Sequence, residues 1–393
     1  MNNFYQNYHF LKDTKLLCKP LNKWLKATRF IRGAGGSSNI IVLGKLDNRE
    51  IVIKVTPRFR KFANEKAARN NDLLEIVLYK YFTKEYVLKY KTPHIVGIYT
   101  HKICPNIFNV FDVKCPTIKQ LLTSRKTKDN VLCQYIRDVL KRKSTEQEFD
   151  MSLLEFCPTS IDYEMQLLVH EFKTKKIKFL AIENFIYRAS FQIIYTLACL
   201  YKNEKNFTHN DFFLRNILGT YETSYGNNDY VEYKIFNKSF YLPANGFYSK
   251  INDFGFTVIY PTIKPNFVDE VYGPMGTIWK KDDEKSDIYN FFYDFYNGEN
   301  LGAFSTMRIF VENRMTKAYV KKMQKIFDNF IKIKELNKMM NVDLRRMDGI
   351  WNISDYKFMQ KLVKTPKEYI KSDVFKRYSK LPKGSRIVQT YSC

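Results

Sequence analysis

Apolar residues in the first part of the chain cluster in short runs that predict strands. The runs at 39–43 and 50–55 flank the turn-like tetrapeptide Leu46-Asp47-Asn48-Arg49, and this arrangement predicts a β-hairpin. A helix is predicted next, ending before Pro93, because five apolar residues recur at helical spacing. These residues are Leu73, Leu74, Val77, Leu78 and Tyr81.

Two more strands are predicted further along, at 94–103 and 163–172. A basic and polar segment separates them, and we interpret it as an insertion at about 105–160. Helical patterns dominate the later part of the chain, at 184–201, 287–296 and the Lys-rich 316–340. The sequence therefore predicts an α+β fold with two unlike lobes, the first rich in strands and the second helical.

The domain boundaries follow from this change of pattern, since no internal repeat and no Pro/Gly/Ser-rich linker divides the chain. We place an N-terminal extension at 1–25 and a strand-rich N-lobe at 26–180, with a hinge near 170–175. A C-lobe follows at 181–393, with a hairpin-like insertion at about 219–250 and a basic helical C-terminal region. A ligand is expected in the cleft between the lobes.

Composition is that of a folded chain. With 393 residues the chain exceeds the size at which a single core stops growing. Hydrophobic residues make up 45% and charged residues 27%, which is ordinary for a globular protein. Residues 1–20 lack the apolar core of a signal peptide, and no apolar run is long enough to span a bilayer. We therefore expect a soluble protein that is not exported and has no membrane span.

The seven cysteines form no Cys-x-x-Cys pair. Their odd number and their spacing favour reduced, mostly buried thiols over a disulfide framework or a zinc site. A reducing compartment such as the cytosol is the corresponding expectation.

The net charge of +25 is the outlier of the composition. It favours contact with an acidic partner such as nucleic acid, anionic lipid or an acidic protein. A coding bias toward Lys, Asn, Ile, Tyr and Phe would produce the same charge without any partner, and the Lys and Arg residues are indeed dispersed. Both explanations stay open.

A glycine-rich segment, Gly33-Ala34-Gly35-Gly36-Ser37-Ser38-Asn39-Ile40, stands directly before the predicted hairpin. Glycines there let backbone N–H groups close on phosphate oxygens. The segment is not a Walker A motif, because no Lys-Ser/Thr follows, and not a Rossmann turn, because a strand comes next. By itself such a segment is more often only a tight turn.

Lys54 ends the apolar strand Ile51-Val52-Ile53-Lys54. A buried ammonium is costly unless an anion meets it. Glu75, in the middle of the predicted helix, supplies one anion, and the phosphates of a nucleotide would supply a second. The alternative is that Lys54 merely reaches solvent from the strand end.

The most specific signal is the segment His209-Asn210-Asp211-Phe212-Phe213-Leu214-Arg215-Asn216, followed after an insertion by Asp253-Phe254-Gly255. The H-x-D-x-x-x-x-N and D-F-G patterns occur in the order used by protein kinases, behind the predicted helix at 184–201. Phosphoryl transfer needs a carboxylate to orient the incoming hydroxyl and hard oxygen ligands for magnesium. Asp211, Asn216 and Asp253 supply these groups.

These motifs resemble those of eukaryotic-type protein kinases, and more closely the divergent serine/threonine protein kinases of large nucleocytoplasmic DNA viruses. The resemblance covers about residues 32–296 and implies a bilobal protein-kinase-like fold that uses ATP with Mg²⁺ or Mn²⁺. Thr92-Pro93-His94-Ile95-Val96 and the insertion before Asp253 resemble the viral group in particular. Ser286-Asp287-Ile288-Tyr289 resembles the start of the helix that anchors the catalytic loop.

By this resemblance, Asp211 is the catalytic base, and Asn216 and Asp253 hold the metal. Lys54 contacts the α- and β-phosphates while it pairs with Glu75. Arg215 sits where tyrosine kinases carry an arginine, within reach of the γ-phosphate.

The resemblance also implies the nucleotide-binding positions. Leu168-Val169-His170-Glu171-Phe172 resembles the strand and hinge that hold adenine, with His170 at the gatekeeper position. The glycine-rich segment covers the phosphates, with Ser38 in place of the third glycine. The implied nucleotide-binding residues are Gly33, Ala34, Gly35, Gly36, Ser37, Ser38, Ile40, Lys54, His170, Glu171 and Phe172.

Three features depart from the family pattern. Asn210 replaces the arginine that receives an activation-loop phosphate in many kinases, so that switch is expected to be missing. Phe213 replaces the lysine typical of serine/threonine kinases, which puts residue specificity in doubt. No Ala-Pro-Glu motif is present, and only about ten residues separate Thr277 from Asp287.

The sequence thus predicts a protein kinase that phosphorylates serine or threonine hydroxyls of proteins. Three alternatives stay open: a pseudokinase, a basic virion-associated binding protein, and a small-molecule phosphotransferase with a kinase-like fold. Protein substrates are the expected partners, with nonspecific contact to nucleic acid or other polyanions as a second expectation. The expected location is the host cytoplasm, with packaging in the virion as an addition, and the sequence leaves the oligomeric state open.

Overall fold

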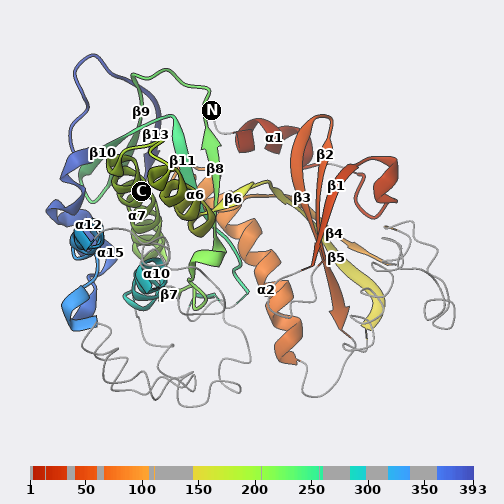
Figure 1. Cartoon of the computed structure of the whole chain (residues 1–393). Coiled ribbons are helices and arrows are strands. Elements are labelled where there is room, and N and C mark those ends of the chain that lie inside the picture. The colour runs from red at the N-terminus through yellow and green to blue at the C-terminus, as the bar shows by residue number, and fades with distance from the viewer. Residues whose placement is uncertain are drawn as a thin grey trace. The chain divides into compact units, whose positions relative to one another are not determined.

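The computed structural model describes eleven stretches of the chain (Figure 1). They are residues 3–13, 15–32, 40–59, 66–105, 110, 145–204, 206–255, 257–259, 284–297, 317–336 and 361–393. The chain divides into two compact units. The first contains Met1–Lys80 and Gly97–Phe156, and the second contains Tyr81–Val96 and Cys157–Cys393.

The first unit is built on a five-stranded antiparallel sheet in the order β1-β2-β3-β5-β4. Its helices are α1 (Asn3–Leu11), the 3₁₀ turn η1 (Leu21–Lys23) and α2 (Lys66–Phe82). Its strands are β1 (Lys26–Arg32), β2 (Ile40–Leu46), β3 (Arg49–Phe59), β4 (Ile98–Cys104) and β5 (Thr145–Glu155).

The β2–β3 hairpin lies where the sequence predicts it. Its two turn residues, Asp47 and Asn48, have φ values of 46° and 64°, as a type I′ turn requires. Ile51, Ile53 and Val55 of β3 are fully buried and alternate along the strand, so one face of the sheet carries the core. The predicted helix is also confirmed as α2, although it ends at Phe82, well before Pro93.

The N-terminal segment packs against this sheet. The ring of Phe4 is buried and stacks on Tyr99 of β4, with 4.8 Å between the ring centroids. A Cβ at Gly97 would lie 2.1 Å from the Phe4 ring, so only glycine fits beneath it. Leu11, Leu17 and Leu21 are buried as well.

The second unit contains three small sheets, with strand orders β10-β9-β13, β11-β8-β6 and β12-β7. Its strands are β6 (Thr159–Ser160), β7 (Phe207–Thr208), β8 (Ile217–Glu222), β9 (Asp229–Ile235), β10 (Lys238–Pro243), β11 (Gly246–Ile251), β12 (Val258–Ile259) and β13 (Arg386–Ser392). Its helices are the π-helical turn η3 (Thr83–Val87), α6 (Ile161–Lys173), α7 (Phe179–Asn203), the 3₁₀ turn η4 (Leu214–Asn216), α10 (Ser286–Asn297), α12 (Lys317–Phe327), α15 (Pro366–Lys371) and η5 (Asp373–Tyr378).

Helix α7 is the central element of the second unit. Most of its residues from Phe185 onward are buried, which explains why its apolar pattern extends around the helix. Arg188 of α7 donates to the carbonyl oxygens of Pro243, Asn245 and Phe247 at 2.7–3.0 Å. These bonds fix the turn between β10 and β11 to the helix.

The C-terminal region is less helical than the sequence predicts. After α15 and η5 the chain forms β13, which pairs in parallel with β9. Arg386 at the start of β13 donates two hydrogen bonds, each of 3.0 Å, to the carboxylate of Asp229. The register of this pairing could not be read from a segment whose partner lies more than 150 residues earlier.

The strand predicted at 163–172 is wrong, because this segment belongs to helix α6. Ile161, Met165 and Val169 recur every four residues and are buried, which is helical spacing. Tyr163 and Leu167 lie on the exposed side, 60% and 41% accessible. These exposed apolar residues fill the gaps in the helical pattern and give the segment the continuous apolar character of a strand.

The strand that the sequence interpretation missed is β5, inside the presumed insertion at about 105–160. Phe149, Met151 and Leu153 are buried at every second position, a strand pattern within an otherwise polar segment. The chain leaves the first unit after Phe156, directly beyond β5, and not near 170–175 as the sequence suggested.

The cysteines also differ from expectation. Cys18 is bonded to Cys104, and Cys199 to Cys393, with Cα–Cα distances of 5.2 and 5.6 Å. The expectation of reduced thiols is therefore wrong for these four residues. Cys157 is partly buried.

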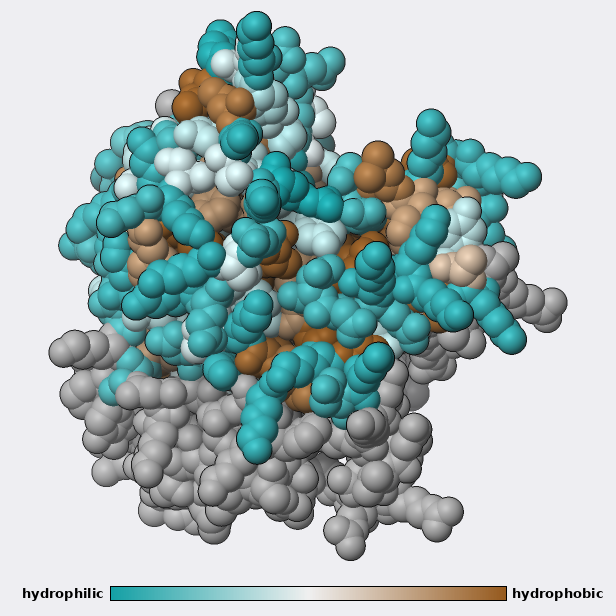
Figure 2. All heavy atoms as spheres, turned by 90° about the vertical axis from the view of Figure 1, so that its left-hand side faces the viewer, coloured by the Kyte–Doolittle hydropathy of each residue, from teal (hydrophilic) through white to brown (hydrophobic). Residues whose placement is uncertain are grey.

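Hydrophilic side chains cover most of the described part of the face seen in Figure 2, with small apolar patches between them. Among the described residues, no helix combines the length and the apolar character needed to cross a bilayer.

We predict that the Cys199–Cys393 disulfide stabilises the second unit. In oxidised protein, Cys199→Ser should lower the free energy of unfolding by about 2–4 kcal/mol, because the crosslink restricts the unfolded chain. Urea unfolding measured with and without dithiothreitol tests this, and the difference should vanish in reductant. Cys157→Ser is the matched control and should change little. Equal stability of Cys199→Ser and wild type without reductant would contradict the prediction.

Candidate active site

Lys54 and Glu75 form a tight ion pair in the first unit. The Lys54 Nζ lies 2.6 Å from both carboxylate oxygens of Glu75. The two side chains are only 13% and 5% exposed, so the ammonium is held inside the unit and does not extend into solvent. β3 and α2 supply the two partners, as the sequence predicts.

Two short ladders of the second unit fix the loop that carries Asp211. Thr208 in β7 pairs with Val258 in β12 on one side of the loop. On its other side, Ile217 at the start of β8 pairs with Ile251 at the end of β11. The segments 209–216 and 252–255 therefore lie between these two ladders, and Asn252 contacts Asn216 and His209.

Asp211 is held by both of its carboxylate oxygens. Arg215 donates to Oδ1 at 2.7 Å, and the Asn216 side-chain amide donates to Oδ2 at 2.8 Å. The same amide also donates to the Asp211 carbonyl oxygen at 2.8 Å. The carboxylate is oriented by its neighbours and remains 16% exposed, which suits a group that must meet a substrate.

Asn216 and Asp253 lie at the open end of the β8–β11 ladder. The N–H of Asn252 donates to the Asn216 carbonyl oxygen at 2.9 Å, which places Asp253 one residue beyond this contact. Both Asn216 Nδ2 hydrogens are directed to Asp211, so its Oδ1 is the atom available to a cation. Amide and carboxylate oxygens are ligands that suit Mg²⁺, which takes its other ligands from phosphates and water.

Backbone conformation marks both loops. Asn210 and Asp253 adopt left-handed φ values of 66° and 62°. Asn and Asp tolerate this region better than other residues with a side chain. Asparagine thus suits position 210, where many kinases carry arginine.

The aromatic residue after Asp253 anchors its loop. Phe254 is fully buried between Phe82 and His209, with ring centroids 4.8 and 5.3 Å away. His209 Nε2 contacts the Asn252 carbonyl oxygen at 3.1 Å. These contacts connect the 209–216 loop to residues 252–254.

Asp287, near the start of α10, holds the backbone of the catalytic loop. Its carboxylate accepts from the N–H groups of His209 and Asn210, at 2.8 and 3.2 Å, and from the Tyr201 hydroxyl at 3.0 Å. The carboxyl is fully buried, and burial raises its pKa while these hydrogen bonds oppose the shift. The anchoring helix expected from Ser286-Asp287-Ile288-Tyr289 is therefore present, and these bonds give its physical basis.

A second carboxylate of α10 supports the same loop and was missed in the sequence. Asp294 accepts from the Leu214 N–H at 2.8 Å and is 1% exposed. Burial raises the pKa of Asp294 to about 6, against the lowering effect of this hydrogen bond and of Arg215. The seven-residue spacing from Asp287 puts both side chains on one face of the helix, and this spacing was the available signal.

His94 of the Thr92-Pro93-His94-Ile95-Val96 segment is structural. It is fully buried, and its ring nitrogens contact the Ser249 carbonyl oxygen and the Tyr233 hydroxyl, both at 2.9 Å. Burial lowers its pKa, so this imidazole is neutral at physiological pH.

The predicted nucleotide-binding residues are only partly accounted for. Ile40 begins β2, whereas Gly33, Ala34, Gly35, Gly36, Ser37 and Ser38 lie outside the described residues. His170, Glu171 and Phe172 end helix α6, where the Phe172 ring packs on Phe179 and Tyr319. Their assignment to an adenine-binding strand was wrong, because no strand forms there.

The structure therefore groups the predicted residues in two sets. Lys54 and Glu75 belong to the first unit, and Asp211, Arg215, Asn216 and Asp253 to the second. The activation segment at 260–283, which includes Thr277, lies outside the described residues.

Comparison with known proteins gives one informative relative. No protein-family model matches this chain. A protein of Acanthamoeba polyphaga mimivirus, provisionally named serine/threonine-protein kinase R301, is 33% identical over 406 residues. The alignment covers 100% of this chain and 98% of that protein, so the similarity extends from end to end.

The raised pKa of Asp294 predicts a pH-dependent stability. An unfolded Asp loses its proton near pH 3.8, whereas the folded group keeps it up to about pH 6. The stability that this carboxyl contributes is therefore present below pH 3.8 and is lost as the pH rises through 6. Asp294→Asn keeps an oxygen acceptor for Leu214 and carries no charge. The free energy of unfolding of this variant, relative to that of wild type, should increase by about 1 kcal/mol between pH 5 and pH 8.

Urea unfolding at the two pH values measures this change. The control is Asp328→Asn, because Asp328 also accepts from a backbone N–H, that of Ile333, but is exposed. A pH-independent effect of Asp294→Asn would contradict the assignment.

Proposed function

Because this chain belongs to the family of giant-virus serine/threonine protein kinases that includes the mimivirus relative, we propose that it transfers the γ-phosphoryl group of ATP to serine or threonine hydroxyls of proteins. The observation that carries the proposal is the Asp211 carboxylate, which Arg215 and Asn216 orient in a loop anchored by Asp287. A bilobal kinase-like arrangement of the two units is part of this proposal.

Asp211 acts as the base in the proposed reaction. One of its oxygens accepts the proton of the substrate hydroxyl as the hydroxyl oxygen attacks the γ-phosphorus. The amide of Asn216 holds the other side of the carboxylate, so the group needs little reorientation during the reaction. Arg215, 39% exposed, lies beside the same carboxylate and can contact a phosphoryl oxygen without leaving it.

Asn216 and Asp253 would hold Mg²⁺, which neutralises negative charge on the β- and γ-phosphates when it is bound. Lys54 contributes a second positive charge, directed at the α- and β-phosphates. Glu75 keeps that ammonium in a single position, since both carboxylate oxygens contact it.

In the kinases that this chain resembles, a strand and the hinge after it hold adenine. We therefore place adenine binding at the end of β5 and in the residues directly after it, Glu155, Phe156 and Cys157, and not at 168–172. The Glu155 N–H already donates to the Gly97 carbonyl oxygen at 2.9 Å, which fixes where the segment begins.

We predict different effects for the two acidic residues. Asp253→Ala should abolish transfer, because a magnesium ligand is lost. Asp211→Asn should lower kcat by about 10²–10⁴-fold with little change in the KM for ATP, because only the proton acceptor is lost. Initial rates with casein, labelled ATP and Mg²⁺ measure both. Asp373→Asn, an exposed change in the same unit, is the control. Wild-type turnover of Asp211→Asn would rule out its role as base.

The acceptor is identified in the same assay. Acid hydrolysis of the labelled protein should yield phosphoserine or phosphothreonine. Transfer to small cationic alcohols but not to protein would replace the proposal with a small-molecule phosphotransferase.

The Lys54–Glu75 pair gives a separate prediction. Lys54→Met should lower kcat/KM by about 10²–10³-fold, because a charge directed at the phosphates is lost. It should also destabilise the first unit, because the buried Glu75 loses its lysine partner.

A double variant separates the two effects. Lys54→Met with Glu75→Gln should recover most of the stability, measured by urea unfolding, but none of the activity. The control is Lys45→Met, which changes an exposed lysine of β2 that pairs with Glu50 of β3. Recovery of activity in the double variant would show that Lys54 serves only the fold.

A further inference from the structure

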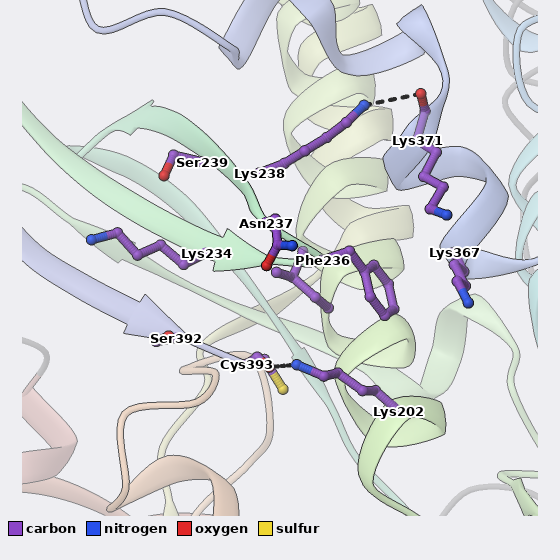
Figure 3. Close-up of a pocket in the computed structure, with 11 residues that line it drawn as sticks. Lys202, Lys234, Phe236, Asn237, Lys238, Ser239, Lys367, Lys371, Ser392 and Cys393 are labelled. Atoms are coloured by element: carbon purple, nitrogen blue, oxygen red, sulfur yellow. Dashed lines mark hydrogen bonds between the residues drawn. The ribbon is translucent and has the colours of Figure 1, made fainter.

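A pocket of about 690 Å³ in the second unit is lined by five lysines and an aromatic ring (Figure 3). The side chains come from the end of α7, the β9–β10 turn and α15, and the end of β13 completes the wall. They are Lys202, Lys234, Phe236, Lys238, Lys367 and Lys371. None of the residues of the candidate active site lines this pocket.

The pocket carries a large positive charge. None of its eleven lining residues has a carboxylate side chain. Glu232 lies outside the lining and pairs with Lys234 at 3.1 Å. Among the described residues, no Asp or Glu side chain forms an ion pair with the other four lysines. Like charges that share one concavity repel each other, and an anion bound there would relieve the repulsion.

Phe236 concentrates this charge. The ring lies 5.8 Å from the Lys202 Nζ and 5.6 Å from the Lys367 Nζ, within the range of cation–π contacts. Figure 3 shows the ring among Lys202, Lys367 and Lys371. The ring therefore draws ammonium groups from two different helices together.

The backbone that presents Phe236 is strained. Ile235 pairs with Lys238, so Phe236 and Asn237 form a two-residue turn with φ values of 50° and 60°. Asn and Gly favour this left-handed conformation, whereas it is costly for a bulky residue such as Phe. Strain of this kind gathers at functional sites, which singles out Phe236 as more than a surface residue.

The pocket wall is fixed in place. The Cys393 N–H donates to the Lys234 carbonyl oxygen at 2.9 Å, and the Cys199–Cys393 disulfide ties the end of β13 to α7. Lys202 Nζ donates to the Cys393 carbonyl oxygen, and Lys238 Nζ donates to that of Lys371 at 3.0 Å. Two of the cations are thereby positioned before any ligand arrives, which lowers the entropic cost of binding.

We propose that this pocket binds a compact ligand that carries several phosphate groups, of the inositol polyphosphate or short linear polyphosphate type. The volume lies in the range of small-molecule sites, which run from about 300 to 1,000 Å³. Lysines act as point charges and suit clustered phosphates, while the arginine forks typical of phosphopeptide sites are absent from the lining. Cations already occupy the surroundings of the Phe236 ring, which disfavours stacking of a nucleic-acid base.

Titration calorimetry with two charge-matched double variants tests the proposal. Lys367→Gln with Lys371→Gln removes two charges from the pocket. Lys380→Gln with Lys383→Gln removes two charges from exposed lysines elsewhere in the same unit. The probes are inositol hexakisphosphate and inorganic tripolyphosphate at moderate salt. We expect one site per chain, at least about tenfold weaker binding in the pocket variant, and less than about twofold change in the control.

The two probes distinguish an inositol polyphosphate from a linear polyphosphate, because the probe that binds with the higher affinity indicates which class of ligand the pocket prefers. Equal weakening in both double variants would overturn the proposal in favour of diffuse surface charge. Absence of saturable binding by both probes would also overturn it. A single-stranded oligothymidylate that bound tighter than both probes, and lost its affinity in the pocket variant, would replace it with a nucleic-acid contact.

Phe236→Gly is a second variant, chosen because it should change the pocket without unfolding the protein. Glycine adopts the left-handed turn without strain, so the fold should be kept or stabilised. Without the ring, the ammonium groups lose their common contact, and affinity for the tighter probe should fall several-fold. Unchanged affinity in this variant, with the fold confirmed by urea unfolding, would contradict the role of Phe236.

Discussion

The candidate catalytic loop depends on one buried carboxylate, that of Asp287. Two consecutive backbone N–H groups of the loop, at His209 and Asn210, end on this side chain, together with the Tyr201 hydroxyl. A buried N–H without an acceptor costs about 1–3 kcal/mol of folding free energy. Removing the carboxylate would leave both of these N–H groups without an acceptor. Because Asn210 adopts a left-handed conformation directly before Asp211, the anchor also determines where the predicted base points.

Further contacts position the part of the loop that carries Asp211. Asp294, on the same face of α10, accepts from Leu214 and fixes the far side of the loop. Between the two anchors, Arg215 and Asn216 turn back to the carboxylate of Asp211. Three carboxylates thus have different tasks because their surroundings differ: Asp287 and Asp294 are buried and bind backbone, whereas Asp211 stays accessible.

The positive charge of the chain has at least one structural focus. The pocket at the end of α7, the β9–β10 turn and α15 gathers five of the basic side chains around Phe236 (Figure 3). Coding bias explains dispersed lysines, but it does not explain a bulky residue held in a left-handed turn among them. The Cys18–Cys104 and Cys199–Cys393 disulfides differ from the reduced thiols that the sequence predicts.

The sequence by itself indicated a set of candidate residues and most of the local elements that carry them. The hairpin before Lys54, the helix with Glu75, and the order of Asp211, Asn216 and Asp253 all follow from local spacing, because turns and short loops are specified by neighbouring residues. Tertiary structure decided that β5 pairs with β3 and β4, and that Asp294 accepts from the N–H of Leu214. It also joined Cys199 to Cys393 across 194 residues. Such contacts depend on packing between distant segments, and no local pattern encodes which distant residue becomes the partner.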